Sequence, residues 1–126
     1  MLCLEIIKGG FTVSKLRSWK DVPEGQFVFA AETDCEISLV CPDRLVPDGA
    51  LISESGWSMM RIKGQLEFSL IGILSGLTAV LAENKIGVFA ISTYDTDYLM
   101  VKTSELSGAV KAIETAGYTV EAHDSL

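Results

Sequence analysis

Apolar residues in the second half of the chain recur at spacings that predict alternating strands and helices. Residues 57–62 mix apolar and polar side chains as strands do, and Lys63-Gly64 ends the run. A helix is expected over about residues 69–83, where one apolar stripe recurs at helical spacing: Leu70, Ile73, Leu74, Leu77, Val80 and Leu81. Two short apolar runs, at 88–92 and 98–101, predict strands on either side of a polar turn.

A second helix and a final strand complete this pattern. Thr103 or Ser104 is placed to cap the helix, whose apolar stripe is Leu106, Ala109, Val110 and Ile113. Gly117 stands where a left-handed helix end is expected, and the alternating residues after it predict a half-exposed strand. The order β-α-β-β-α-β predicts an α+β, ferredoxin-like unit, with both helices on one face of a four-stranded antiparallel sheet.

The first half of the chain resembles an incomplete copy of the second. Residues 29–33 align with 89–93 at a spacing of 60, and after a one-residue slip residues 36–40 align with 97–101. Only residues 17–25 separate the first two candidate strands, and Pro42 and Pro47 restrict a second helix. We therefore expect two tandem units: a degenerate one in residues 1–55 and a complete one in residues 56–126.

Charge and hydropathy narrow the range of partners. The chain of 126 residues carries 10 Lys and Arg against 17 Asp and Glu, a net charge of −7 that opposes binding to nucleic acid or to anionic membranes. Its longest apolar stretch, residues 68–82, is interrupted by polar residues and is shorter than the ~20 residues of a membrane-spanning helix. The mean hydropathy of +0.34 suggests apolar surface buried between subunits, so a homodimer is expected.

The residues that usually carry catalysis or bind metals are sparse. The three cysteines, Cys3, Cys35 and Cys41, lack metal-ligand spacing, and His123 is the only histidine. The sequence contains no candidate nucleophile with a neighbouring base. We therefore expect that the chain is not an enzyme and binds no cofactor or metal. The N-terminal residues show no signal-peptide pattern, which favours the cytoplasm and reduced thiols.

Six consecutive hydrogen-bonding side chains form the densest polar cluster, residues 92–97: Ser92, Thr93, Tyr94, Asp95, Thr96 and Asp97. A hairpin turn explains such residues, because their side chains bond to the nearby backbone. A ligand site also explains them, because carboxylates at the end of an apolar strand can receive an ammonium group. The residues alone leave both interpretations open.

Residues 89–101, FAISTYDTDYLMV, closely resemble the signature of ACT domains in aspartokinase regulatory regions. They are also similar to small tandem ACT-like proteins related to cytosolic arginine sensors. The resemblance extends over about residues 56–122 and more weakly over 33–42. The resemblance implies the same ferredoxin-like fold that the order of elements predicts. It also implies that amino acids bind at interfaces between paired units.

The resemblance also implies where a ligand would bind. Gly72 with Ile73 matches the family's glycine-plus-apolar pair, whose backbone faces the ligand, and Asp97 would receive the ammonium group. Leu70 stands where the arginine sensors carry an acidic residue, which favours a small or apolar amino acid. The glycine loop has no counterpart in the first half, so no second equivalent site is expected. The predicted site comprises Leu70, Gly72, Ile73, Thr93, Tyr94, Asp95, Thr96 and Asp97.

The function expected from these arguments is that of a non-catalytic regulatory or sensory module for a small amino acid. Other hypotheses remain: a structural or adaptor dimer whose ligand site has decayed, and a small enzyme on a ferredoxin-like fold. A single-stranded RNA binder is opposed by the net charge of −7. The fold alone does not choose among them.

Overall fold

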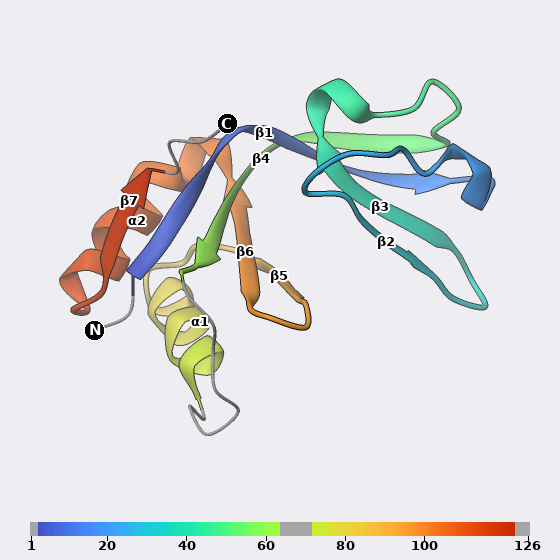
Figure 1. Ribbon diagram of the computed structural model, residues 1–126. Coiled ribbons are helices and arrows are strands. Elements are labelled where there is room, and N and C mark those ends of the chain that lie inside the picture. Colours follow the sequence, from blue (N-terminus) through green and yellow to red (C-terminus); the bar gives the residue numbers. More distant parts are fainter. Residues whose placement is uncertain (1–2, 64–71, 123–126) are drawn as a thin grey trace. The chain divides into compact units, whose positions relative to one another are not determined.

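The computed structural model describes residues 3–63 and 72–122, which form two compact units (Figure 1). The N-terminal unit is residues 9–57, and the C-terminal unit comprises the described residues of 3–8 and 58–122. Strand β1 (Cys3–Leu16) and strand β4 (Ile52–Ile62) each contribute residues to both units. The division predicted after residue 55 had placed residues 3–8 with the first half instead.

The C-terminal unit follows the predicted order β-α-β-β-α-β. Its elements are the end of β4, α1 (Ile73–Glu83), β5 (Phe89–Ser92), β6 (Asp97–Lys102), α2 (Leu106–Thr115) and β7 (Thr119–Ala122). The ferredoxin-like fold class is therefore confirmed. Within the described residues, no helix has the length and hydropathy needed to span a membrane.

The apolar stripes of both helices pack into one core. Leu77 and Leu81 of α1 and Ala109 and Ile113 of α2 are fully buried against the sheet. The strand residues in this core are Leu4, Met60, Ile62, Leu99 and Val101. Because one cluster contains both helices, they cover the same face of the sheet, as the periodicity predicts. Burial of each large side chain here stabilises the fold by roughly 1.5–3 kcal/mol.

The sheet of the C-terminal unit contains one strand more than predicted. Its order is β7-β1-β4-β6-β5, and β1 pairs in parallel with β7 from Cys3↔Thr119 to Ile6↔Ala122. On the other side, the Lys63 N–H donates to the Cys3 carbonyl at 2.8 Å. The expectation of a purely antiparallel four-stranded sheet was wrong. The start of the chain supplies the added strand, which lies outside the β-α-β-β-α-β segment read from the sequence.

The N-terminal unit repeats the same order with its helices reduced to single turns. Strands β1, β2 (Phe29–Glu32), β3 (Ile37–Pro42) and β4 follow the order β2-β3-β1-β4. The two helix positions hold the 3-10 turns η1 (Trp19–Asp21) and η2 (Asp43–Leu45). One core cluster of this unit contains the buried residues Leu16, Leu39 and Cys41 with partly buried residues around them, and Phe11 and Val40 are buried as well. The first unit is thus degenerate, as predicted.

The two β-hairpins are related by a constant spacing of 60 residues. Phe29 pairs with Val40 in the first hairpin, and Phe89 pairs with Met100 in the second. The turns that follow, η2 and η3 (Thr103–Glu105), also begin 60 residues apart. The predicted one-residue slip was wrong. It had aligned Glu36 with an acidic residue of β6, whereas Glu36 lies in the hairpin turn.

The start of α2 differs from the prediction, and its end agrees with it. Neither Thr103 nor Ser104 caps α2, because η3 precedes the helix and Glu105 occupies the N-cap without a side-chain bond. The Thr103 hydroxyl instead lies 2.9 Å from the Ser58 hydroxyl. At the other end, Gly117 has φ +105° and its N–H donates to the Glu114 carbonyl. Together with Tyr118 N–H to Ile113 O, this forms the predicted left-handed cap.

Candidate functional site

The polar cluster predicted from the sequence forms the turn between β5 and β6. The ladder ends at the pair Ser92↔Asp97, and the Thr93 N–H donates to the Thr96 carbonyl at 2.9 Å. The Thr93 hydroxyl donates to the same carbonyl at 3.0 Å and accepts a 3.4 Å bond from the Thr96 N–H. These local hydrogen bonds show that the Thr93 side chain stabilises the hairpin turn.

Thr96 anchors the turn to the rest of the C-terminal unit. Its side chain is buried, with 8% of the residue exposed, and its hydroxyl donates to the Ile62 carbonyl at 2.9 Å. Ile62 is the last residue of β4, so this bond joins the turn to a neighbouring strand end. The hydroxyl of Thr96 is therefore occupied in holding the turn in place.

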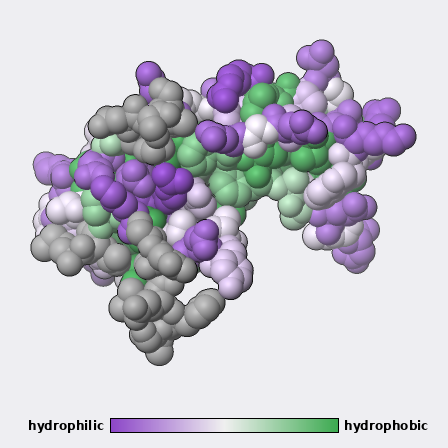
Figure 2. Space-filling model, in the orientation of Figure 1, coloured by the Kyte–Doolittle hydropathy of each residue, from purple (hydrophilic) through white to green (hydrophobic). Residues whose placement is uncertain are grey.

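The remaining side chains of the turn are more accessible. Tyr94 is 91% exposed, and Asp95 beside it is also exposed. Asp97 is half-buried as the first residue of β6. Hydrophilic residues occupy the hairpin tips on the face seen in Figure 2. The turn therefore presents one phenol and two carboxylates on a backbone that Thr93 and Thr96 hold.

Gly72 and Ile73 lie where α1 begins. Gly72 is the N-cap residue, is exposed and has φ +84°, a left-handed conformation that residues with a Cβ adopt at a cost. Its carbonyl accepts the first helical bond, from the Gly76 N–H at 2.8 Å. Ile73 is half-buried and packs against the core of the C-terminal unit. Leu70 lies outside the described residues.

The two predicted segments belong to the same unit, but the described residues show no hydrogen bond or ion pair that joins Gly72 or Ile73 to residues 93–97. Two cavities found in the described part of the chain include none of the predicted site residues. One lies in the C-terminal unit near the end of α1 and along α2, with a volume of about 360 Å³, and is lined by Asn84, Ile86, Gly108, Lys111, Ala112 and Thr115. The other, in the N-terminal unit, was not foreseen from the sequence.

The corresponding turn of the N-terminal unit has the same backbone hydrogen bond but different side chains. The Thr33 N–H donates to the Glu36 carbonyl at 2.8 Å, as Thr93 does to Thr96. The Thr33 hydroxyl accepts bonds from the N–H groups of Cys35 and Glu36. At the spacing of 60, Ile37 occupies the position of Asp97, so this turn lacks the carboxylate predicted to receive an ammonium group.

Arg61 interacts with Glu5 and Tyr98 on the sheet of the C-terminal unit. Its guanidinium donates to Glu5 Oε1 at 3.2 Å and lies 5.9 Å from the centre of the Tyr98 ring. Burial lowers the pKa of Arg61, but the hydrogen bonds and charges of Tyr98 and Glu5 outweigh burial and raise that pKa. Among the residues described here, no group of His, Cys, Asp and Glu side chains is arranged to hold a metal ion.

Comparisons with known proteins agree with this architecture. The family model described as ACT domain matches residues 52–115. The fold is similar to protein Atu0741 from Agobacterium tumefaciens, with TM-score 0.87 and 28% identity over 98% of this chain and 94% of that one. It is also similar to the protein of unknown function VC0802 from Vibrio cholerae, titled a possible transport protein, with TM-score 0.72 and 18% identity over 90% and 88% of the chains. No curated protein matches the chain significantly.

Aspartate kinase regulatory domains have the same fold. The ligand-free regulatory subunit of aspartate kinase from Thermus thermophilus gives a TM-score of 0.67 at 6% identity, over 90% of this chain and 96% of that one. The matched segment, residues 52–115, is half of the chain and includes both helices, the β5–β6 turn and Gly72. From this match and the ferredoxin-like architecture, we conclude that the chain belongs to the ACT domain family.

Proposed function

We propose that the protein is a non-catalytic regulatory or sensory module that binds a free α-amino acid between the Gly72 end of α1 and the turn at residues 93–97. The match of the ACT family over residues 52–115 carries this proposal, because that segment contains both ends of the site. The similarity to aspartate kinase regulatory subunits supports a regulatory fold. The proposed location is the cytoplasm.

The chemistry of a zwitterion gives the physical argument. The first N–H groups of α1 have no acceptor within their own helix, and the positive end of the helix dipole favours a carboxylate there. Gly72 carries no side chain, so its backbone is open to close approach. The carboxylate of Asp97, or that of Asp95, would accept charge-assisted hydrogen bonds from the ammonium group.

The side-chain preference follows from the apolar residues of the same segments. Leu70, Ile73 and Tyr94 would contact the side chain of the ligand, which favours a small or apolar amino acid over arginine. Thr93 and Thr96 would act as positioning residues, because their hydroxyls bond within the turn and to β4. Arg61 supports the non-catalytic interpretation, since it is paired with Glu5 rather than placed in a loop that could grip a phosphate.

Calorimetry with each of the twenty amino acids at millimolar concentration tests the proposal. We expect saturable heat from one or a few small or apolar amino acids. Heat from none of them would contradict the proposal and favour a structural dimer whose site has decayed. Turnover of an acyl phosphate by the wild-type chain would instead favour an enzyme on this fold.

A further inference from the structure

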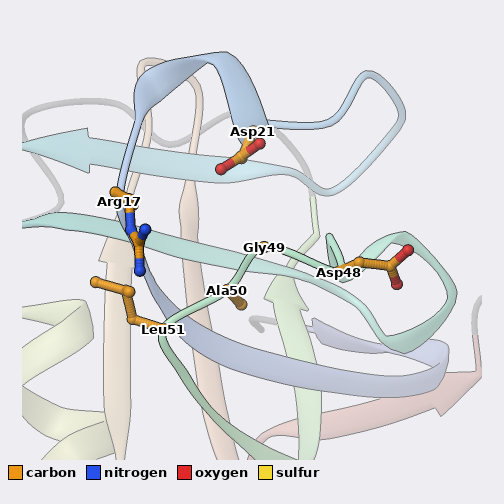
Figure 3. A pocket seen from close by; sticks show the side chains of 6 residues that line it. All are labelled: Arg17, Asp21, Asp48, Gly49, Ala50 and Leu51. Carbon is orange, nitrogen blue, oxygen red and sulfur yellow. The ribbon is translucent and has the colours of Figure 1, made fainter.

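A cavity of about 490 Å³ opens in the N-terminal unit (Figure 3). It is lined by Arg17, Asp21, Asp48, Gly49, Ala50 and Leu51. Its volume lies in the range of roughly 300–1,000 Å³ that is typical of small-molecule sites. The lining residues belong to the two connections in which 3-10 turns replace helices. All of them precede residue 52, where the match to the ACT family begins.

One wall of the cavity is held by the turn that follows β1. Arg17 comes directly after Leu16, the buried last residue of that strand. Ser18 caps η1: its hydroxyl accepts a bond from the Lys20 N–H at 3.2 Å, and its carbonyl accepts one from the Asp21 N–H at 3.1 Å. These bonds fix the backbone from which Asp21 extends.

The opposite wall is the segment that enters β4. The Ala50 N–H donates to the Pro47 carbonyl at 3.2 Å, and the Leu51 N–H donates to the Lys15 carbonyl at 2.8 Å. A Cβ atom on Gly49 would lie 3.2 Å from Asp21 Oδ2, closer than ordinary contact. Glycine at this position therefore lets the Asp21 carboxylate approach the backbone of the opposite wall.

Arg17 and Asp21 place opposite charges on one cavity without neutralising each other. Within the described residues, Arg17 makes no ion pair with Asp21 or Asp48. Figure 3 shows the Arg17 side chain beside Leu51, the Asp21 carboxylate near Gly49, and the Asp48 carboxylate directed away from Arg17. Leu51, which is 48% exposed, adds apolar surface next to the cation.

The geometry points to a second binding site, for a free α-amino acid with an apolar side chain, in this cavity. Arg17 binds the carboxylate of the ligand through its paired N–H donors, and Asp21 accepts hydrogen bonds from its ammonium group. Leu51 and Ala50 contact the side chain. This site shares no residue with the one at Gly72 and residues 93–97, so either site can exist without the other.

Amide chemical shifts of the full ¹⁵N-labelled chain test this site, because they locate binding. L-Leucine is the probe, and N-acetyl-L-leucine and L-leucinamide each lack one of its two charges. We expect saturable shifts at the amides of Gly49, Ala50 and Leu51 with L-leucine, and at least tenfold weaker binding of both analogues. Equal binding of N-acetyl-L-leucine, or no saturable shift at these three amides, would overturn the assignment.

Substitutions identify the residues responsible. Arg17→Gln and Asp21→Asn should each weaken the L-leucine response at Gly49 tenfold or more, whereas the control Glu24→Gln, at an exposed carboxylate outside the cavity lining, should leave it unchanged. The rest of the amide spectrum shows whether each variant is folded. An unchanged response in folded Arg17→Gln would overturn the site. Shifts confined to Gly72 and residues 93–97 would overturn it too, while supporting the proposed function.

Discussion

The hydroxyl of Thr96 donates a hydrogen bond to the carbonyl of Ile62 across 2.9 Å, and so joins the β5–β6 turn to the end of β4. The bond is buried, and its acceptor belongs to the last residue of the strand. The turn that carries Asp95 and Asp97 is thereby attached to the strand from which the chain continues toward α1. Its position is set by the sheet and not by the turn alone.

Thr96→Val tests the contribution of this bond. The substitution conserves shape but leaves the Ile62 carbonyl without its buried donor, which should lower the free energy of unfolding by about 1–3 kcal/mol. Thr115→Val, at an exposed position that ends α2, serves as the control and should change it by less than about 0.5 kcal/mol. Urea denaturation measures both. Equal stability of the two variants would show that the Thr96 bond contributes nothing specific.

Leu77→Asp should unfold the protein. Leu77 is fully buried in the core of the C-terminal unit, and an unpaired carboxylate there costs several kcal/mol out of a total of roughly 5–15 kcal/mol. Leu74→Asp, at a half-buried position on the same stripe, should be destabilising but less so. Ser75→Asp is the exposed control on α1. A cooperative thermal transition for Leu77→Asp at the wild-type temperature would contradict the observed helix register.

The thiols of Cys35 and Cys41 should differ in reactivity. Cys35 is exposed in the turn between β2 and β3, whereas Cys41 is buried. Burial, and then the charge of Asp43, raise the pKa of Cys41 above the ordinary value of 9.0. Mass spectrometry during iodoacetamide treatment of the folded chain should find Cys35 modified first and Cys41 only after unfolding. Comparable rates at the two thiols would contradict this assignment.

Because the pKa of Cys41 is raised, the free energy of unfolding should decrease at alkaline pH. The unfolded thiol loses its proton near the ordinary pKa of 9.0, while the folded one retains it to higher pH. Unfolding therefore releases a proton in that window, and this contribution to stability is lost as the pH rises from about 9.0 through the folded pKa. Cys41→Ala should remove that part of the alkaline dependence, as measured by denaturation at a series of pH values.

A homodimer is expected in solution. The outer strands β2 and β5 each pair on one side within the described sheets, so their other edges can accept a strand from a second copy. Sedimentation at high micromolar concentration should give twice the monomer mass of 13.6 kDa. A single species of monomer mass at that concentration would contradict the expectation.

The sequence predicted the parts of the fold that depend on local periodicity. The stripe containing Leu77 and the stripe containing Ile113 identified both helices, and Gly117 marked the end of α2. The start of α1 was placed too early, near residue 69, because the helix begins at Ile73 after the left-handed Gly72. The position of β1 beside β7 was missed, because pairing between distant strands leaves no periodic signal of its own. The slip in the repeat arose from matching acidic residues, whereas backbone pairing sets the spacing of 60.

The candidate sites could be predicted only in part from the sequence. The polar run at residues 92–97 was recognised, but the bond from Thr96 to Ile62 required the fold to bring two strand ends together. The cavity near Arg17 was missed entirely. The sequence placed Arg17 in the connection after the first candidate strand, but the cavity forms only because folding brings together two connections about 30 residues apart along the chain.

Calorimetry on the Asp97→Asn variant tests the central claim, amino-acid binding at the β5–β6 turn, most directly. The variant keeps the shape of the side chain but removes its charge, so the best ligand of the wild-type chain should bind more weakly by about 1.5–3 kcal/mol. Asp34→Asn, on the corresponding turn of the N-terminal unit, is the matched control and should bind as the wild type does. Weakened binding in Asp97→Asn alone is the predicted result, and equal binding by both variants would contradict the claim.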